Sequence, residues 1–154
     1  MKFVYIDLQN MSSLKSEQFQ FFIKHVVGKK PFVLIVTAAF CPHCIAFKPP
    51  LSKALKKIGA TKNLELDARF IVHFSDETSS HIIRNHPDSL LGQILYNNVT
   101  GYPTFLYASQ LLKESKTHKG GSSQASNKTT MNILHFENER TAENIADFIR
   151  NMKN

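Results

Sequence analysis

Hydrophobic positions recur along this chain in two periods, and together they predict alternating strands and helices. Short continuous apolar runs are typical of strands buried on both faces, whereas apolar residues at i, i+3, i+4 and i+7 are typical of amphipathic helices. Strands are predicted at 3–8, 31–40, 68–75, 103–109 and 131–137, and helices at 16–27, 45–59, 86–98 and 141–152. The resulting order β-α-β-α-β-α-β-β-α predicts an α/β sandwich with a mixed sheet.

Prolines mark two of the predicted helices. Pro87 is predicted to occupy the first position of the helix 86–98, where its fixed φ and its missing N–H are tolerated. Pro49 and Pro50 lie inside the helix that ends at Gly59. They should kink this helix after its first turns, because each ring removes a hydrogen-bond donor and clashes with the preceding turn.

The composition is that of an ordinary globular protein and narrows the function only slightly. The 154 residues, 42% of them hydrophobic, are most simply one domain spanning 1–154. The 19 basic and 12 acidic side chains give a net charge of +7, which favours acidic partners without specifying one. The segment 113–130 is rich in Lys, Ser, Thr and Gly and lacks an apolar anchor, so it is predicted to be a flexible insertion before the last strand.

No segment of the sequence resembles a targeting signal or a membrane anchor. The apolar run near the N-terminus is too short for a secretory signal, no stretch approaches about 18 apolar residues, and the final "RNMKN" is not a retention signal. These features predict a cytoplasmic protein without a membrane span. The abundance of Asn and Lys is typical of an AT-rich genome, and a large cytoplasmic DNA virus is one source that fits, with the virion as a second location.

Cys41 and Cys44 are the only cysteines, and they lie three positions apart. A disulfide between them would close a very small loop and remove little entropy from the unfolded chain, so a purely structural disulfide is a poor explanation. Two explanations remain, which are half of a metal site and a dithiol that cycles between its reduced and oxidised forms.

A metal site would need two more ligands, and His81 with His86 is the best available pair. However, 36 residues separate Cys44 from His81, whereas about twelve separate the two ligand pairs of a zinc finger. A closed zinc site also usually organises a small, loop-rich fold, and this chain has a full apolar core of its own. The sequence therefore favours the redox dithiol and predicts no metal, nucleotide or flavin cofactor.

The position of the cysteines in the predicted order of elements supports the redox interpretation. The pair lies where the strand 31–40 ends and a helix begins, and a helix N-terminus offers partial positive charge and free backbone N–H groups. Cys41 can then ionise more readily than an ordinary thiol, and Cys44, one turn further, can attack a mixed disulfide on Cys41. A C-x-x-C beside a βαβ pattern is a signature of thioredoxin-like proteins.

Four segments carry a resemblance to a known family. They are "CPHC" at 41–44, Pro49 five residues after Cys44, "VTGYPTF" at 99–105 and "ENERTAENIADFI" at 137–149. With these segments the chain resembles the thioredoxin superfamily, and most closely the catalytic domains of protein disulfide isomerase. The Pro-His pair between the cysteines is also that of the bacterial oxidase DsbA. The resemblance implies a thioredoxin fold, a three-layer α/β/α sandwich around a central mixed sheet.

The resemblance also implies an activity and a site. The activity is thiol–disulfide exchange on protein cysteines, oxidising or isomerising, with a thiol oxidase or reductase as a second partner. Cys41 would be the nucleophile, Cys44 the resolving thiol, and His43 would favour the Cys41 thiolate. The remaining site residues would dock a substrate strand: Tyr102, Pro103 after a cis bond, and Thr104 as the wall, with Phe40 and Pro42 as apolar contacts.

Two substitutions depart from the family pattern and leave other functions open. Phe40 stands where the family usually has tryptophan, and Ile35 stands where it often buries an acid that helps the second thiol lose its proton. Ile35 is the best support for an alternative, a binding or chaperone module that holds partners at the Pro103 face without turnover. Lys53, Lys56 and Lys57 suggest a nucleic-acid binder, but no aromatic stacking platform or recognition motif accompanies them.

Overall fold

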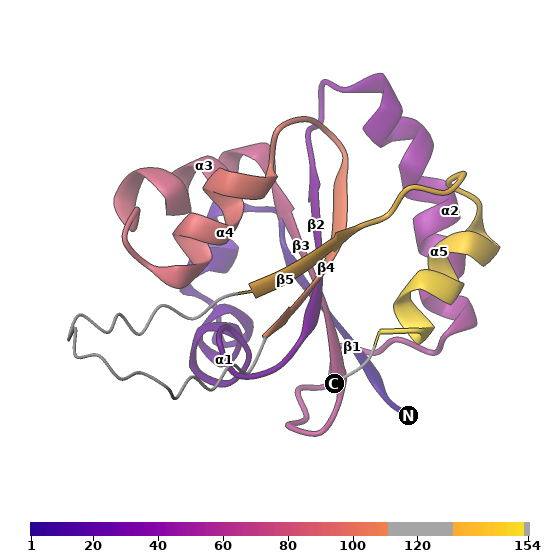
Figure 1. Ribbon diagram of the computed structural model, residues 1–154, viewed down its shortest axis with the longest axis horizontal. Coiled ribbons are helices and arrows are strands. Elements are labelled where there is room, and N and C mark those ends of the chain that lie inside the picture. The colour runs from indigo at the N-terminus through magenta and orange to yellow at the C-terminus, as the bar shows by residue number, and fades with distance from the viewer. Residues whose placement is uncertain (111–130, 153–154) are drawn as a thin grey trace, which may run out of the picture.

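A five-stranded sheet forms the middle layer of the computed structural model, which describes residues 1–110 and 131–152 (Figure 1). The strands are β1 (Phe3–Leu8), β2 (Phe32–Thr37), β3 (Arg69–Ser75), β4 (Thr104–Gln110) and β5 (Met131–His135). Their order in the sheet is β1-β3-β2-β4-β5, with β1, β3 and β2 mutually parallel and β4 antiparallel to both of its neighbours. The insertion predicted at 113–130 lies outside the described residues.

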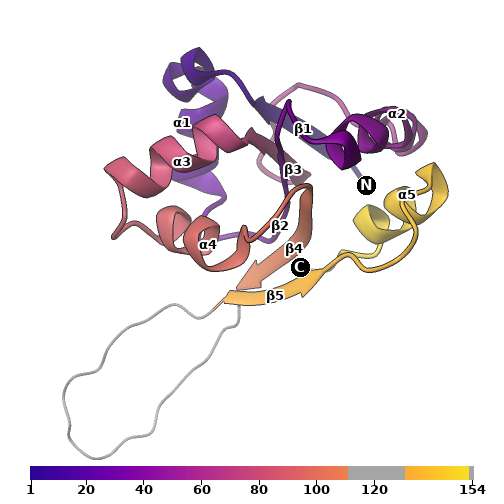
Figure 2. The ribbon, with the colours of Figure 1, turned by 90° about the horizontal axis from the view of Figure 1, so that it is seen from above.

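Helices cover both faces of this sheet, as the two perpendicular views show (Figures 1 and 2). They are α1 (Glu17–His25), α2 (Pro42–Lys57), α3 (Asp76–Asn85), α4 (Leu90–Asn98) and α5 (Ala142–Arg150), with a 3-10 helix, η1, at Met11–Lys15. One face carries α2 and α5, and the other carries α1, α3 and α4. This strand order with these two helix layers is the thioredoxin fold, and it confirms the predicted α/β sandwich with a mixed sheet.

The central strand β2 explains why the sheet needs cover on both sides. All six of its residues are buried, and their side chains alternate between the two layers. Leu34 packs into the core under α1, α3 and α4, and Ile35 packs into the core under α2 and α5. A continuous apolar run therefore predicted this strand correctly, because no polar face had to reach water.

The sequence did not predict α3, and it placed the start of α4 three residues too early. α3 is largely polar, and buried hydroxyls at Thr78 and Ser79 stand where an apolar stripe would have shown the helical period. Its start is instead marked by a capping box between Ser75 and Thr78. α4 begins at Leu90 rather than near Pro87, because the Ser89 hydroxyl accepts the Gly92 N–H at 2.9 Å and caps the helix there.

Gly92→Ala is expected to destabilise the fold, because α4 passes close to the end of α3 at this residue. A Cβ on Gly92 would lie 2.1 Å from the backbone carbonyl oxygen of His86, so one of the two segments would have to move. We expect a loss of about 1–3 kcal/mol in the free energy of unfolding, measured by urea denaturation. Gly101→Ala is the matched control, because a Cβ there meets no atom within 4 Å. Equal unfolding midpoints for the two variants would contradict this packing.

Candidate active site

The two cysteines lie at the junction between β2 and α2. Cys41 is the N-cap residue of α2, with extended backbone (φ −95°, ψ 120°), and Pro42 occupies the first helical turn, where its missing N–H costs no hydrogen bond. The Cys41 N–H donates to the Ala38 carbonyl at 3.2 Å, and the Cys41 carbonyl accepts from Ile45 N–H at 3.1 Å. The junction is therefore a short, hydrogen-bonded turn that presents Cys41 to the helix N-terminus.

The Cys41 thiol is partly exposed, and its pKa is lower than the ordinary value of a cysteine. The main cause is the backbone N–H of Cys44, which stabilises the thiolate, with further contributions from the Cys44 side chain, the His43 backbone N–H and the positive charge of Arg140. These amides belong to the first turn of α2, whose N–H groups are directed toward the helix N-terminus, and the Cys44 N–H also donates to the Cys41 carbonyl at 3.1 Å. The geometry thus favours the form of Cys41 that can act as a nucleophile.

Cys44 lies one turn deeper and has the opposite character. Its side chain is buried, and burial raises the pKa of its thiol. The Ala38 N–H donates to the Cys44 sulfur at 3.3 Å and works against that rise, because it would stabilise the thiolate. Two thiols three residues apart are therefore unequal in both access and acidity.

The segment predicted to dock substrate lies beside Cys41. The Tyr102–Pro103 peptide bond is cis, and the Cys41 thiol lies 3.5 Å from the Tyr102 carbonyl oxygen. Phe40 is 72% exposed, and its ring meets that of Tyr102 edge-on with centroids 6.2 Å apart. Thr104 differs from these neighbours, because it is buried and its hydroxyl donates to the Gly101 carbonyl at 2.7 Å. Its side chain therefore braces the turn, while Phe40 and Tyr102 form an accessible surface.

A polar cleft opens on the other side of the cysteines, between α2 and the segment that leads into α5. It has a volume of about 400 Å³ and is lined by His43, Ala46, Phe47, Phe136 and residues 137–140. Arg140 lowers the pKa of both cysteines by its charge. Arg140 was not predicted as a site residue, although it lies within the "ENERTAENIADFI" segment that carried the resemblance.

A second polar cluster lies under α2, in an otherwise apolar layer. His73 on β3 is buried, and its ring nitrogens form hydrogen bonds with the Tyr5 hydroxyl (2.6 Å, Nδ1) and the Thr37 hydroxyl (2.9 Å, Nε2). Burial lowers the pKa of His73 to about 4, and the nearby Asp7 and Lys48 act on it in opposite directions. His73 is therefore neutral at physiological pH. It is also the direct partner of Ile35 in the sheet register, and the sequence gave no signal for this cluster.

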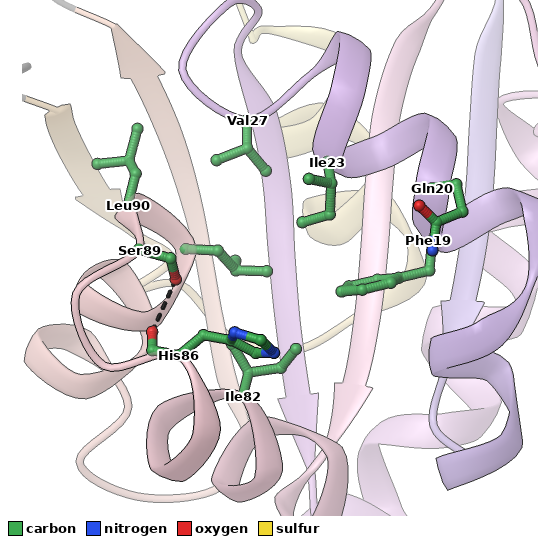
Figure 3. Close-up of a pocket in the computed structure, with 9 residues that line it drawn as sticks. Phe19, Gln20, Ile23, Val27, Ile82, His86, Ser89 and Leu90 are labelled. Atoms are coloured by element: carbon green, nitrogen blue, oxygen red, sulfur yellow. Dashed lines mark hydrogen bonds between the residues drawn. The ribbon is translucent and has the colours of Figure 1, made fainter.

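A groove on the opposite face of the sheet is separate from the dithiol. It lies between α1 and the corner where α3 meets α4, with a volume of about 280 Å³ (Figure 3). Its lining is mainly apolar and comprises Phe19, Ile23, Val27, Ile82, Leu90 and Leu91, together with Gln20, His86 and Ser89. The Ser89 hydroxyl donates to the His86 carbonyl at 2.8 Å. His81 and His86, considered above as metal ligands, belong to this side of the sheet and not to the side of the cysteines.

Within residues 1–110 and 131–152, no three His, Cys, Asp or Glu side chains come together as a metal site would require. Among the helices described there, none has the length and apolar character that would let it cross a membrane.

Comparisons with known proteins return distant structural likenesses. No family model matches the sequence, and no curated protein matches it. Among solved structures it is similar to the J-Trx1 fragment of ERdj5 (13% identity, TM-score 0.49, 95% of this chain and 52% of that one) and to the Trx4 domain of ERdj5 (18%, 0.47, 96% and 93%). It is also similar to chloroplastic thioredoxin z (16%, 0.39, 97% and 93%). The chain thus spans about half the length of the first of these.

The fold assignment follows from the strand order and the helix layers themselves. Within that fold, a Cys-x-x-Cys pair stands at the junction between β2 and α2. An accessible Cys41 and a buried Cys44 at this junction form an arrangement that can support thiol–disulfide exchange.

The buried His73 is expected to make the protein acid-labile. The unfolded chain takes up a proton on this histidine near pH 6.5, whereas the folded protein does so only at about pH 4. The contribution of His73 to the free energy of unfolding should therefore be constant above about pH 6.5, fall by up to about 3 kcal/mol as the pH drops to about 4, and level off below. Urea unfolding midpoints across this range measure the effect.

His73→Gln should remove much of this pH dependence, whatever it does to stability at pH 7. His135→Gln is the matched control, because His135 is an exposed histidine on the edge strand β5. If stability depends on pH as steeply in His73→Gln as in His135→Gln and the wild type, another group is responsible.

Proposed function

We propose that the protein is a thiol–disulfide oxidoreductase that acts on protein cysteines through the Cys41–Cys44 couple, in the manner of a protein disulfide isomerase domain. The observation that carries the proposal is the difference between the two thiols. Cys41 is accessible and has a lowered pKa, whereas Cys44 is buried and has a raised one. A dithiol that performs two successive exchange steps needs one ready nucleophile and one thiol held in reserve.

In the direction that reduces a substrate disulfide, the exchange proceeds in two steps. The Cys41 thiolate attacks one substrate sulfur, forms a mixed disulfide and releases the other substrate sulfur as a thiolate, which takes up a proton. Cys44 then loses its proton and attacks the Cys41 sulfur. This second step forms the Cys41–Cys44 disulfide and releases the second substrate thiolate, so two electrons pass from the protein to the substrate. Oxidation of a substrate dithiol is the same sequence reversed.

The neighbouring groups take supporting roles in this proposal. The backbone N–H of His43 favours the Cys41 thiolate, and Pro42 and Phe40 offer apolar contact to the substrate. The Tyr102–Thr104 segment forms the wall on which an extended substrate strand pairs through its backbone. A thiol oxidase or reductase resets the couple. The cytoplasmic or virion location stays a prediction from the sequence.

We expect the oxidising direction to be favoured. Groups that stabilise the Cys41 thiolate also stabilise the reduced protein, and that makes the disulfide a better oxidant. The reduction potentials of such couples run from about −270 mV for thioredoxin to about −120 mV for DsbA. The amides at the start of α2 and the charge of Arg140 lower the pKa of Cys41, which should shift the reduction potential toward the less negative value of DsbA.

Single-cysteine variants test the assignment of roles. Cys44→Ser should accumulate a long-lived mixed disulfide with a scrambled or reduced protein substrate, because the attacking thiol remains and the resolving one is gone. Cys41→Ser should form little, because the remaining thiol is buried. Non-reducing electrophoresis and mass spectrometry of the trapped species measure both. Preferential trapping by Cys41→Ser would reverse the assignment.

The reduction potential tests the preferred direction. Equilibration of the wild-type protein with glutathione should give a value above about −200 mV, in the oxidising half of the range. Arg140→Gln should make that value more negative, because it removes a positive charge that favours the Cys41 thiolate. The effect should shrink as salt is added, since Arg140 is exposed. Arg150→Gln, at the end of α5, is the matched control. A wild-type value near that of thioredoxin would make the protein a reductant.

The same assays separate catalysis from the alternative, a module that binds partners at the Pro103 face without turnover. The exposed Phe40–Tyr102 surface would serve either function. A catalyst should regenerate activity in a denatured, scrambled protein at substoichiometric amounts, and Cys41→Ser should lose this ability. Binding that survives Cys41→Ser and is not accompanied by turnover would establish the binding module instead.

A further inference from the structure

The resolving step of the proposed exchange requires a buried thiol to lose its proton. Cys44 must ionise in order to attack, yet burial raises the pKa of its thiol. The described structure places one backbone donor on its sulfur, the Ala38 N–H at 3.3 Å. Arg140 also favours the Cys44 thiolate by its charge, but the Ala38 N–H acts on it more strongly, so the reactivity of Cys44 depends on how well that peptide group is held in place.

The peptide that carries this donor sits at the end of β2 and joins Thr37 to Ala38. Besides the pairing of Thr37 with Ser75 in the sheet, two hydrogen bonds restrain its neighbourhood. The Ala38 carbonyl accepts the Cys41 N–H at 3.2 Å, and the Thr37 hydroxyl hydrogen-bonds with His73 Nε2 at 2.9 Å. The first bond restrains the side toward the helix, and the second restrains the side toward the sheet.

The second restraint reaches across three strands. His73 lies on β3, one strand away from Thr37 on β2, and its other ring nitrogen meets the Tyr5 hydroxyl on β1 at 2.6 Å. His73 is 2% exposed and Thr37 is 3% exposed, so water does not compete for these bonds. A buried polar network with every member paired is rigid, and a histidine with both ring nitrogens engaged has a defined orientation.

Packing alone does not explain why the polar residues Tyr5, His73 and Thr37 lie at this place in the core. Its members lie on the sheet face that α2 covers, where the surrounding buried side chains are apolar. Leucine or phenylalanine would pack such a position without the cost of burying an imidazole. The feature that distinguishes this position is its link, through Thr37, to the peptide that donates to Cys44.

The geometry points to the Tyr5–His73–Thr37 network as a positioning device for the resolving cysteine: it holds the Thr37–Ala38 peptide so that the Ala38 amide is directed at the Cys44 sulfur. This inference rests on the proposed function, because it assigns these residues to its second step. They touch neither substrate nor reacting sulfur and act only through that peptide.

Thr37→Val is the direct test, because it keeps the shape of the side chain and removes the hydroxyl that binds His73. A chromogenic aromatic disulfide separates the two steps in a single turnover: attack by Cys41 releases the first coloured thiolate, and resolution by Cys44 releases the second. Thr37→Val should leave the first phase within twofold of wild type. It should slow the second phase about three- to fourfold at neutral pH, because a roughly tenfold loss of Cys44 thiolate is partly offset by the greater nucleophilicity of a more basic thiol.

The pH profile of the second phase distinguishes positioning from general loosening of the fold. Above the pKa of Cys44 in both proteins, the thiolate is fully formed, so Thr37→Val should no longer be slower than wild type. The other charged or titratable groups near Cys44 are Cys41, Arg140 and Tyr102, and those near His73 are Tyr5, Asp7 and Lys48. None of these changes in the variant, so a displaced profile reports on Cys44 itself.

Two further variants complete the test. Thr37→Ser restores the hydroxyl and should return the second phase to the wild-type rate. Ser79→Ala removes a buried hydroxyl on the opposite side of the sheet and should leave both phases unchanged. If Thr37→Val does not fold, Tyr5→Phe tests the same network from its far end and should slow the second phase in the same direction.

The outcomes separate this inference from the proposed function. An unchanged second-phase profile in Thr37→Val and Tyr5→Phe, or a Thr37→Ser variant as slow as Thr37→Val, would overturn the positioning role. Failure of the wild-type protein to act on any protein disulfide would instead overturn the proposed function. Because the two-phase reaction is a single turnover with a small disulfide, it remains readable in either case.

Discussion

Backbone amides at the start of α2 stabilise the thiolate of Cys41, and the arrangement of the whole site depends on that interaction. It exists because β2 ends at Thr37 and the chain turns within four residues, 38–41, to begin a helix at Pro42. The sheet holds β2 between β3, which is parallel to it, and β4, which is antiparallel to it. The start of α2 is therefore fixed relative to the sheet. A flexible loop with the same two cysteines would offer no convergent donors and no such stabilisation of a thiolate.

The same turn makes the two thiols unequal. One helical turn separates them, and it carries Cys44 from the surface into the layer between α2 and the sheet. Charge is costly there, and the Ala38 amide and the positive charge of Arg140 offset part of that cost. The dithiol therefore consists of a thiol that is ready to react and a thiol whose reaction depends on its surroundings. The buried histidine network belongs to those surroundings, and it connects the chemistry to the interior of the sheet.

The strands, most of the helices and the dithiol could be predicted from the sequence, because each of them leaves a local pattern. β2 is a continuous apolar run, α5 carries apolar residues at helical spacing, and the cysteines stand between a strand and a helix. α3 left no such pattern, because hydroxyl side chains replace apolar ones on its buried face. Its signal was the capping box at Ser75 and Thr78, which uses threonine where glutamate or glutamine is more usual.

By itself the sequence determined the class of fold and the pair of thiols, since these depend on residues that are close together along the chain. Only the tertiary structure decided which groups surround the thiols. Tyr102 reaches Cys41 across 61 positions, Thr37 reaches His73 across 36, and Tyr5 reaches His73 across 68. Such contacts follow from strand register and helix packing, which bring distant segments within hydrogen-bond distance. A local sequence pattern does not specify which distant residues come into contact. The environment of Cys44 could therefore be identified only from the folded structure.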